Sequence, residues 1–504
     1  MIAEFTKETM GFIFANIIFI LTLVIFGSYL ILGIISALAL RKYLRKNSYV
    51  NYNSLVLSPL SPKVSIIAPA FNESKTIIDN VRTLLSLYYN NFEVILVNDG
   101  STDNTFEKVK EAYELTRVNY YFDYRIPCER IRGVYKSKNP SYNRLTVIDK
   151  NNGGKADSLN AGINICHSSL FVSIDADSII EADSILKLVK PFLEEKDRKV
   201  IGTGGVIRIV NSCDVERGHI REIRLPDSIL PRLQVLEYTR AFLLGRMAWS
   251  QLDGLMLISG AMGMFDRETV IKAGGYSIKT VGEDMELLLR MRRYMAEKEV
   301  KDEVTYIPDP LCWTEVPSDL KSLRKQRTRW TRGLVESLKT HRKIFFNRTY
   351  GHLGILGYPY WFFFEWLSPL IAFSGFVYTI YLVITNSLNW PFYLLLFLFV
   401  YTFAVSFSTW AVLFEEITFH KYKKKRDVLK LLSTALLEPF FYPIHTYFAV
   451  RGNIEALRGK KGWGKAERKG FETKKKPVRQ PSVRQPSVRQ SANLGKAAKP
   501  DSTT

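Results

Sequence analysis

The sequence of 504 residues contains few side chains that bind transition metals or form disulfides. Its 4 cysteines are scattered as Cys128, Cys166, Cys213 and Cys312, and its 6 histidines form no His-Glu-x-x-His motif. This distribution disfavours a zinc site and a disulfide framework, and it indicates reduced thiols in the cytosol. No glycine loop ends in Gly-Lys-Ser or Gly-Lys-Thr, so ATP or GTP hydrolysis is not favoured.

Charged residues are missing from Gly11 to Leu40. As a helix with a rise of about 1.5 Å per residue, this run would measure about 45 Å, longer than a bilayer core of about 30 Å. A cleaved signal peptide would have a basic start and a shorter apolar core, and the preceding residues contain no basic cluster. The run therefore predicts a membrane anchor. The basic cluster at 41–46 places the following chain in the cytoplasm.

The net charge of +21 could indicate a nucleic-acid partner. The basic residues, however, gather at 41–46, at Lys421 to Arg426 and in the tail 451–504, and each of these groups flanks an apolar segment. Cytoplasmic loops of membrane proteins show this bias, and anionic lipid explains the charge. We therefore expect a membrane and no nucleic acid among the partners.

The middle of the chain has the pattern of an α/β domain. Val64–Ala70, Phe92–Val97 and Leu170–Ile174 are short apolar runs without strict alternation, as in strands buried on both faces of a parallel sheet. Helical patterns, such as Thr76–Leu87 and Ala156–Cys166, lie between them. The sequence thus predicts a doubly wound, mostly parallel sheet, with ligands bound at the carboxyl ends of its strands.

Towards the C-terminus, Trp366–Ile384 and Phe392–Leu413 are long enough to span a bilayer. Lys430–Val450 is expected to lie at the interface or re-enter, because a crossing would place the basic tail outside. The predicted parts are the anchor at 1–48, the cytoplasmic domain at 62–320, amphipathic interface helices at 321–350, the spanning and interfacial region at 351–450 and a basic, largely disordered tail at 451–504.

Two acidic motifs follow predicted strands. Asp175 and Asp177 flank one alanine after a buried run, and two such carboxylates suit Mg²⁺ or Mn²⁺ that bridges a diphosphate. The Asp-x-Asp pattern is nevertheless common by chance. Asp99 lies in Asn98-Asp99-Gly100-Ser101, where it could accept hydrogen bonds from a base or ribose or simply cap the next helix.

Three further motifs accompany predicted helices. The glycine loop 151–157, with Lys155, opens a helix and suits phosphate oxygens. Gly282-Glu283-Asp284 precedes another helix, where acidic residues commonly cap and one of them could be a general base. Gln326-Arg327-Thr328-Arg329-Trp330 offers an indole face for a sugar and guanidinium groups for phosphate; the alternative is an ordinary interface helix.

Together, these motifs resemble the membrane-embedded, inverting glycosyltransferases of family 2, which include cellulose, chitin, hyaluronan and poly-β-1,6-N-acetylglucosamine synthases. The resemblance covers about 62–348 and implies a GT-A-like fold; the segment 462–471 is also similar to a tail of bacterial members. The roles it implies are nucleotide or substrate binding for Asn72, Glu73, Asp99, Lys155, Asp157 and Asp175, metal binding for Asp175 and Asp177, catalytic base for Asp284, and diphosphate and acceptor binding for Gln326, Arg329 and Trp330, with 259–263 lining the acceptor site.

The implied activity is inverting, metal-dependent transfer of N-acetylglucosamine or glucose from a UDP-sugar to a growing polysaccharide. The implied setting is the cell inner (plasma) membrane, with several spans, a cytoplasmic catalytic domain and an accessory subunit. Two departures stand out: Gly282 replaces the usual threonine of the base motif, and no Phe-x-Val-Thr segment follows Trp330, which disfavours a cellulose synthase. The alternatives are a non-processive transferase with a lipid acceptor and, in another class, a membrane transporter or receptor.

Overall fold

The computed structural model describes residues 2–48, 52, 56, 58, 61–216 and 218–459. Of the tail predicted at 451–504, only 451–459 belongs to these residues, and 451–457 continues a helix. The rest of that tail, including the segment 462–471, lies outside the described residues.

Within the described residues, ten strands form one mixed sheet in the order β3-β4-β5-β2-β1-β6-β11-β8-β12-β7. Its centre, β5-β2-β1-β6, is parallel, and antiparallel strands extend it on both sides. The predicted α/β class is confirmed, with the parallel pairing concentrated at the centre. The strands are β1 (Val64–Ala70), β2 (Phe92–Asn98), β3 (Leu115–Val118), β4 (Ile131–Ser137), β5 (Leu145–Lys150), β6 (Leu170–Ile174), β7 (Ile179–Ile180), β8 (Lys199–Ile209), β11 (Met262–Asp266) and β12 (Asp302–Thr314), with β9 (Asp214–Glu216) and β10 (His219–Glu222) as a separate hairpin.

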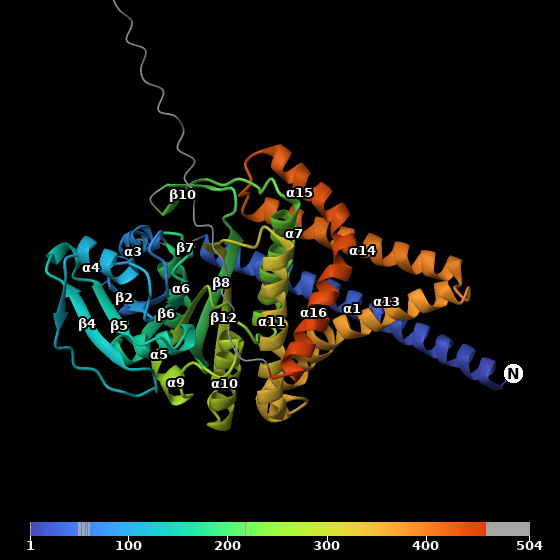
Figure 1. Cartoon of the computed structure of the whole chain (residues 1–504), viewed down its shortest axis with the longest axis horizontal. Coiled ribbons are helices and arrows are strands. Elements are labelled where there is room, and N and C mark those ends of the chain that lie inside the picture. The colour runs from blue at the N-terminus through green and yellow to red at the C-terminus, as the bar shows by residue number, and fades with distance from the viewer. Residues whose placement is uncertain are drawn as a thin grey trace, which may run out of the picture. The chain divides into compact units, whose positions relative to one another are not determined.

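Helices cover the sheet and continue into an apolar bundle (Figure 1). The α-helices are α1 (Ile2–Asn47), α3 (Ile77–Leu85), α4 (Thr105–Ala112), α5 (Lys155–Ile165), α6 (Ser184–Leu193), α7 (Ile229–Tyr238), α8 (Met247–Gln251), α9 (Arg267–Lys272), α10 (Glu283–Glu297), α11 (Leu320–Thr340), α12 (Tyr358–Tyr360), α13 (Ser368–Ile384), α14 (Trp390–Thr418), α15 (Lys425–Leu437) and α16 (Tyr442–Leu457). The π-helical segments are η2 (Thr239–Arg246), η5 (Leu353–Gly357) and η6 (Trp361–Leu367), and the 3₁₀ segments are η1 (Pro140–Tyr142), η3 (Arg342–Ile344), η4 (Arg348–Tyr350) and η7 (Glu438–Phe441).

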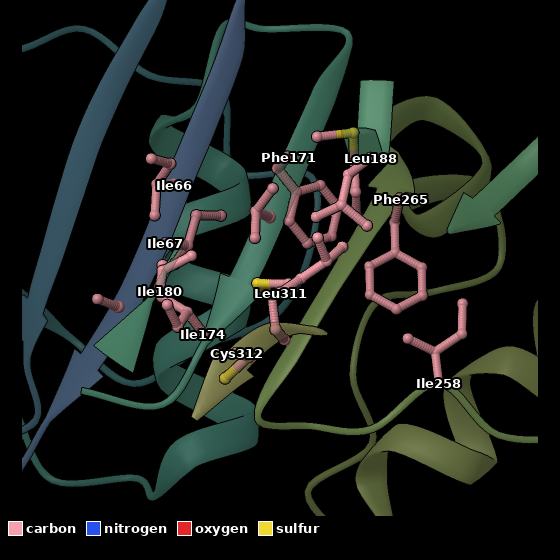
Figure 2. Packing of buried hydrophobic residues seen from close by; sticks show 14 of the residues in the cluster. Ile66, Ile67, Phe171, Ile174, Ile180, Leu188, Ile258, Phe265, Leu311 and Cys312 are labelled. Atoms are coloured by element: carbon pink, nitrogen blue, oxygen red, sulfur yellow. The ribbon is translucent and has the colours of Figure 1, made fainter. Parts of the chain in front are cut away.

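The central strands are apolar on both faces, and this burial explains why they lack an alternating pattern. In β1 and β6, Ile66, Ile67 and Phe171 are completely buried, and Figure 2 shows them packed with side chains from neighbouring strands. Helix α5 lies close against β1, since a methyl group added at Gly162 would come within 2.3 Å of the Ile67 side chain. The hydrophobic core therefore runs along the sheet.

The parallel register brings the predicted motifs to one edge of the sheet. Ala70 at the end of β1 pairs with Asn98 at the end of β2, and β6 runs parallel to β1 on its other side. Asn72, Asp99 and Asp175 follow these three strands directly. The expectation that the motifs lie at the carboxyl edge is thus confirmed.

Three helices are long and apolar enough to cross a membrane: Asn16–Asn47, Leu353–Ile384 and Trp390–Thr418. They contain most of the predicted anchor and both predicted C-terminal spans. Helices α1 and α14 lie side by side, and the rings of Phe26 and Phe403 stack with their centroids 3.7 Å apart. These helices indicate association with a membrane, while the orientation of the chain stays a prediction.

The segment expected at the interface is not one continuous helix. Helices α15 and α16 are separated by η7, which contains Glu438 and Pro439. Proline at this position lacks a backbone N–H and interrupts the helical hydrogen bonds. That Lys430–Val450 does not cross the membrane stays a prediction.

Two ion pairs, one of them fully buried, join the sheet domain to the apolar bundle. Arg208 of β8 pairs with Glu415 near the end of α14, and the two residues are only 6% and 2% exposed. A second pair joins Arg240 of η2 to Glu438, whose other carboxylate oxygen accepts a 2.6 Å bond from Ser408 of α14. The bundle and the sheet domain therefore share a polar, charged contact.

We expect Glu415→Leu alone to destabilise the protein by about 3–5 kcal/mol, because it leaves the Arg208 guanidinium buried without its partner. The double variant Arg208→Met/Glu415→Leu should recover most of this loss. Thermal and chemical unfolding in detergent would measure both changes. If Glu415→Leu were as stable as the wild type, the ion pair would not contribute to holding the bundle and the sheet domain together.

Candidate active site

Asp99 closes the glycine loop that follows β5. Its Oδ1 accepts from Lys150 Nζ at 2.6 Å and from the Gly153 amide at 2.9 Å, and its Oδ2 accepts from Asn152 Nδ2 at 3.2 Å and from the Gly154 amide at 2.8 Å. A carboxylate has about four lone-pair sites, so these four donors saturate it. Asp99 thus orients the loop, and any contact with a nucleotide has to share these oxygens.

Lys150, which the sequence patterns did not single out, is the centre of this cluster. Its side chain is fully buried, and its ammonium lies 2.6 Å from both Asp99 Oδ1 and Asp157 Oδ1. Asp157 Oδ2 accepts from the Glu129 amide at 2.9 Å. The sequence signal that could have identified it is a lysine at the end of an apolar strand, three positions before the first of two glycines. Asp99 and Asp157 therefore share one internal cation.

Asn72 and Glu73 connect the turn after β1 to the turn after β2. Asn72 adopts a left-handed backbone with φ of 57°, and its Oδ1 accepts from the Thr102 amide at 2.8 Å. The Glu73 amide donates to Thr105 Oγ1 at 2.9 Å. Both residues lie at the expected edge, where they hold two loops together; their role in substrate binding stays a prediction.

Lys155, the first residue of α5, reaches the acidic motif after β6. Its Nζ lies 2.6 Å from Asp175 Oδ1, 3.0 Å from the Gly260 carbonyl oxygen and 3.5 Å from Glu283 Oε1. Burial by itself lowers the pKa of Lys155, but the carboxylates of Asp175 and Glu283 outweigh it and raise the pKa above its ordinary value. Lys155 is therefore a firmly protonated cation among acidic groups.

Asp175 and Asp177 are both partly exposed, as metal ligands that must also meet a substrate would be. Burial raises the pKa of the Cys312 thiol to about 12, and the nearby charges of Asp175 and Asp177 add to this rise. Among the described residues, no group of three or more histidine, cysteine or acidic side chains is arranged to hold a metal. Mg²⁺ and Mn²⁺ are commonly held by one or two carboxylates with substrate phosphates and water completing the shell, so the donor set fits such an ion.

Asp284 lies in the first turn of α10, and its carboxylate is partly exposed. Its Oδ2 accepts from the Gly260 amide at 2.9 Å, which places it beside the Gly260 carbonyl that binds Lys155. The segment 259–263 thus connects the predicted base to the predicted metal motif.

Glu283, the neighbour of Asp284, differs from it in burial. Burial raises the pKa of Glu283 to about 7, Lys155 opposes this rise, and Asp284 adds to it. Two adjacent carboxyl groups therefore have different environments, one buried and one accessible. The accessible group, Asp284, is the better placed to meet an acceptor hydroxyl.

Helix α11 carries the last predicted motif. The charge of Arg329 opposes the rise in the pKa of Glu283, so this arginine is within electrostatic range of the acidic cluster. Trp330 is 42% exposed, with the guanidinium of Arg327 4.4 Å from the centre of its ring. Gln326 is half-buried, and its Oε1 has no hydrogen-bond partner among the residues that the structure describes.

Arg327, between the predicted residues, has a different role from Arg329. It forms a two-point ion pair with Glu237 of α7, with Nη2 and Oε2 2.7 Å apart. This pair fixes α11 on α7 and orients one face of Trp330. The structure therefore brings Lys155, Asp175, Glu283, Asp284 and Arg329 together, while Asp99 and Asp157 belong to the adjacent Lys150 cluster.

Known proteins and protein families match the part of the chain that contains this site. The family described as "Glycosyltransferase like family 2" matches residues 62–333. The poly-beta-1,6-N-acetyl-D-glucosamine synthase of Staphylococcus aureus (strain COL) is 30% identical over 280 residues, which are 55% of this chain and 55% of that protein. The synthase of the same name from Staphylococcus epidermidis is 27% identical over 275 residues, again 55% of each. The match spans about half the length of these curated relatives.

Two solved structures have distant similarity. The mannosyltransferase PcManGT from Pyrobaculum calidifontis, in complex with GDP-Man and Mn²⁺, covers 87% of this chain and 100% of its own, with 15% identity and a TM-score of 0.48. Glucosyl-3-phosphoglycerate synthase from Mycobacterium tuberculosis covers 57% and 82%, with 17% identity and a TM-score of 0.33.

The family match begins just before β1 and ends within α11, so it includes every strand end and helix that contributes to the candidate site. It covers more than half of the chain. The resemblance found in the motifs is therefore confirmed, and the chain belongs to the glycosyltransferase-like family 2.

Proposed function

We propose that this protein transfers a sugar from a UDP-sugar to a hydroxyl of a growing polysaccharide at a membrane, with inversion at the anomeric carbon. The observation that carries the proposal is the convergence of Asp284, Lys155 and Asp175 around Gly260. A carboxylate base, a fixed cation and an acidic metal motif are the groups that such a transfer needs at one place.

N-acetylglucosamine is the sugar that we favour, with glucose second. The two curated relatives named above are synthases of a polymer of N-acetylglucosamine. The three apolar helices support a membrane location. Helix α11, which carries the proposed acceptor motif, packs along α16, and α16 contacts the apolar helix α13 (Figure 1). A polymer or a lipid acceptor could meet the site there.

Asp284 would act as the base. Its Oδ2 is held by the Gly260 amide, so the carboxylate has a fixed direction when the acceptor hydroxyl arrives. Asp284 takes the hydroxyl proton as the acceptor oxygen attacks the anomeric carbon opposite the diphosphate. The new C–O bond forms, the bond from the anomeric carbon to the diphosphate oxygen breaks with its electron pair on that oxygen, and an α-linked donor yields a β-glycoside.

The leaving diphosphate needs positive charge near its oxygens. Lys155 and Arg329 are the cationic side chains that the fold brings to the acidic cluster. Asp175 and Asp177 would hold a divalent ion, which supplies Lewis-acid stabilisation of the departing diphosphate. The exposed indole of Trp330 offers a flat apolar surface against which an acceptor sugar can stack.

The direct test is to incubate the purified full-length protein with a panel of UDP-sugars and Mn²⁺ or Mg²⁺, and to measure UDP release and product size. Release with UDP-N-acetylglucosamine and a long product would support the proposal. One sugar added to a lipid would favour the non-processive alternative, and no UDP release with any donor would contradict sugar transfer.

Asp284→Asn should lower UDP release by about 10²–10⁴-fold, because the amide cannot accept the hydroxyl proton. UDP binding should remain close to that of the wild type, since the base does not hold the nucleotide. Calorimetry with UDP would measure binding and a coupled assay would measure release. Glu297→Gln, at the exposed end of the same helix, is the matched control. Near-normal UDP release by Asp284→Asn in the same assay would refute the assignment of Asp284 as the base.

Removal of divalent ions with a chelator should abolish transfer, and Mn²⁺ or Mg²⁺ should restore it. Asp177→Asn should raise the Mn²⁺ concentration for half-maximal activity by about tenfold or more, since even groups that only support a metal ligand often contribute that much. A titration of activity against Mn²⁺ gives this value, with Asp183→Asn on the protein surface as the control. Full activity in the chelator would exclude the metal role of this pair.

A further inference from the structure

The loop that leads into α10 and Asp284 meets α11 through two glycines, Gly282 of the loop and Gly333 of the helix. A methyl group added at Gly333 of α11 would lie 2.8 Å from the Gly282 Cα, and one added at Gly282 would lie 2.9 Å from the Gly333 Cα. Real side-chain carbons do not approach a backbone atom so closely. The contact is therefore backbone against backbone and excludes any larger residue at either position.

Backbone conformation does not require glycine at position 282. Its φ is −114°, which other residues adopt readily, so steric contact is the reason for the glycine. Gly333 lies inside α11, where glycine is a poor helix former. A threonine at position 282 would collide with α11 in this chain. The departure noted in the base motif thus has a physical cause.

Glu336, one turn further along α11, holds the same loop through hydrogen bonds. Its Oε2 accepts from Thr280 Oγ1 at 2.8 Å and from the Val281 amide at 3.0 Å. Its Oε1 lies 3.5 Å from Nε of Arg332, which is itself buried. An ionised acceptor makes stronger hydrogen bonds than a neutral one, so this carboxylate is an effective anchor.

The anchored loop leads directly into the site. The Gly282 carbonyl accepts from the Glu286 amide at 3.0 Å and so begins α10, and Asp284 follows in the first turn. On α11, Trp330 precedes Gly333 by one turn. The helix with the proposed acceptor motif is therefore joined to the loop that precedes Asp284, within one turn of Trp330 on α11 and two residues before Asp284.

We propose that Glu336, acting with the Gly282–Gly333 contact, is a positioning residue that sets Asp284 at its working distance from the acceptor held by α11. Glu336 does not touch the reacting atoms and acts through the loop 280–282. This inference rests on the proposed function, in which Asp284 is the base. The Glu336 contact would explain how the distance between Asp284 and the acceptor motif of α11 is kept constant.

The kinetic test compares Glu336→Ala, Glu336→Gln and Gly333→Ala with the wild type, using UDP-N-acetylglucosamine and Mn²⁺. A small displacement of a catalytic group can lower the rate by about 10²-fold. We expect Glu336→Ala and Gly333→Ala to lower kcat by about 10–100-fold, with KM for the donor and UDP affinity near the wild-type values. Glu336→Gln keeps a neutral acceptor and should recover part of the rate.

Lys339→Ala is the matched control, because Lys339 lies on the exposed side of the same helix and outside the site. Thermal unfolding of each variant in detergent shows whether the protein is folded. Equal kcat in Glu336→Ala and Lys339→Ala would overturn the inference. A parallel loss of kcat, UDP binding and thermal stability would also overturn it, because that result shows only a general packing role.

Hydrogen exchange tests the loop contact without any need for activity. Because the Val281 amide donates to Glu336, peptides that contain 280–284 should exchange faster in Glu336→Ala than in Lys339→Ala. Unchanged exchange there would contradict the inference even in an active enzyme. A wild type that releases no UDP would refute the proposed function instead, and exchange would still decide whether Glu336 holds the loop.

Discussion

The candidate site depends on the ammonium group of Lys155, which lies among carboxylates from two different parts of the fold. Asp175 comes from the end of β6 and Glu283 from the start of α10, and both approach the same Nζ. Without a cation between them, these charges would repel one another in a partly buried place. Lys155 therefore allows the acidic motifs of the proposed metal site and the proposed general base to be close neighbours.

The position of Lys155 is itself determined by a second, deeper ionic cluster. Asp99 binds both glycine amides that precede Lys155, and the buried Lys150 joins Asp99 to Asp157. Ion pairs and hydrogen bonds thus hold the glycine loop, while Lys155, the first residue of the helix that follows the loop, reaches into the site. Two lysines, only five residues apart in sequence, have different tasks: one stabilises the loop and the other organises the acidic groups.

Much of the fold could be predicted from local patterns. The apolar runs of β1, β2 and β6 are buried on both faces, and their parallel pairing carries the motifs that follow them to one edge. The antiparallel partner β11 could not be anticipated in the same way, because it pairs with β6, a strand far from it in the sequence. The spans of α13 and α14 followed from length and composition alone.

The site shows the same division between local and long-range information. Asp175, Asp284 and Arg329 stand in recognisable motifs, and the fold brings them together. The burial of Lys150 and the contact of Glu336 with the base loop could not be predicted, because each depends on residues 50 or more positions away. Asp99 illustrates a partial success: its place at the strand end was expected, and its four internal donors were not.

The most direct test of this account is an experimental structure of the full-length protein with UDP and Mn²⁺. The account predicts that Mn²⁺ binds to Asp175 or Asp177 and to the diphosphate, with Lys155 and Arg329 near the phosphate oxygens and Asp284 facing open space beside Trp330. A nucleotide bound elsewhere, with Mn²⁺ in contact with neither aspartate, would contradict the assignment of this cluster as the sugar-transfer site.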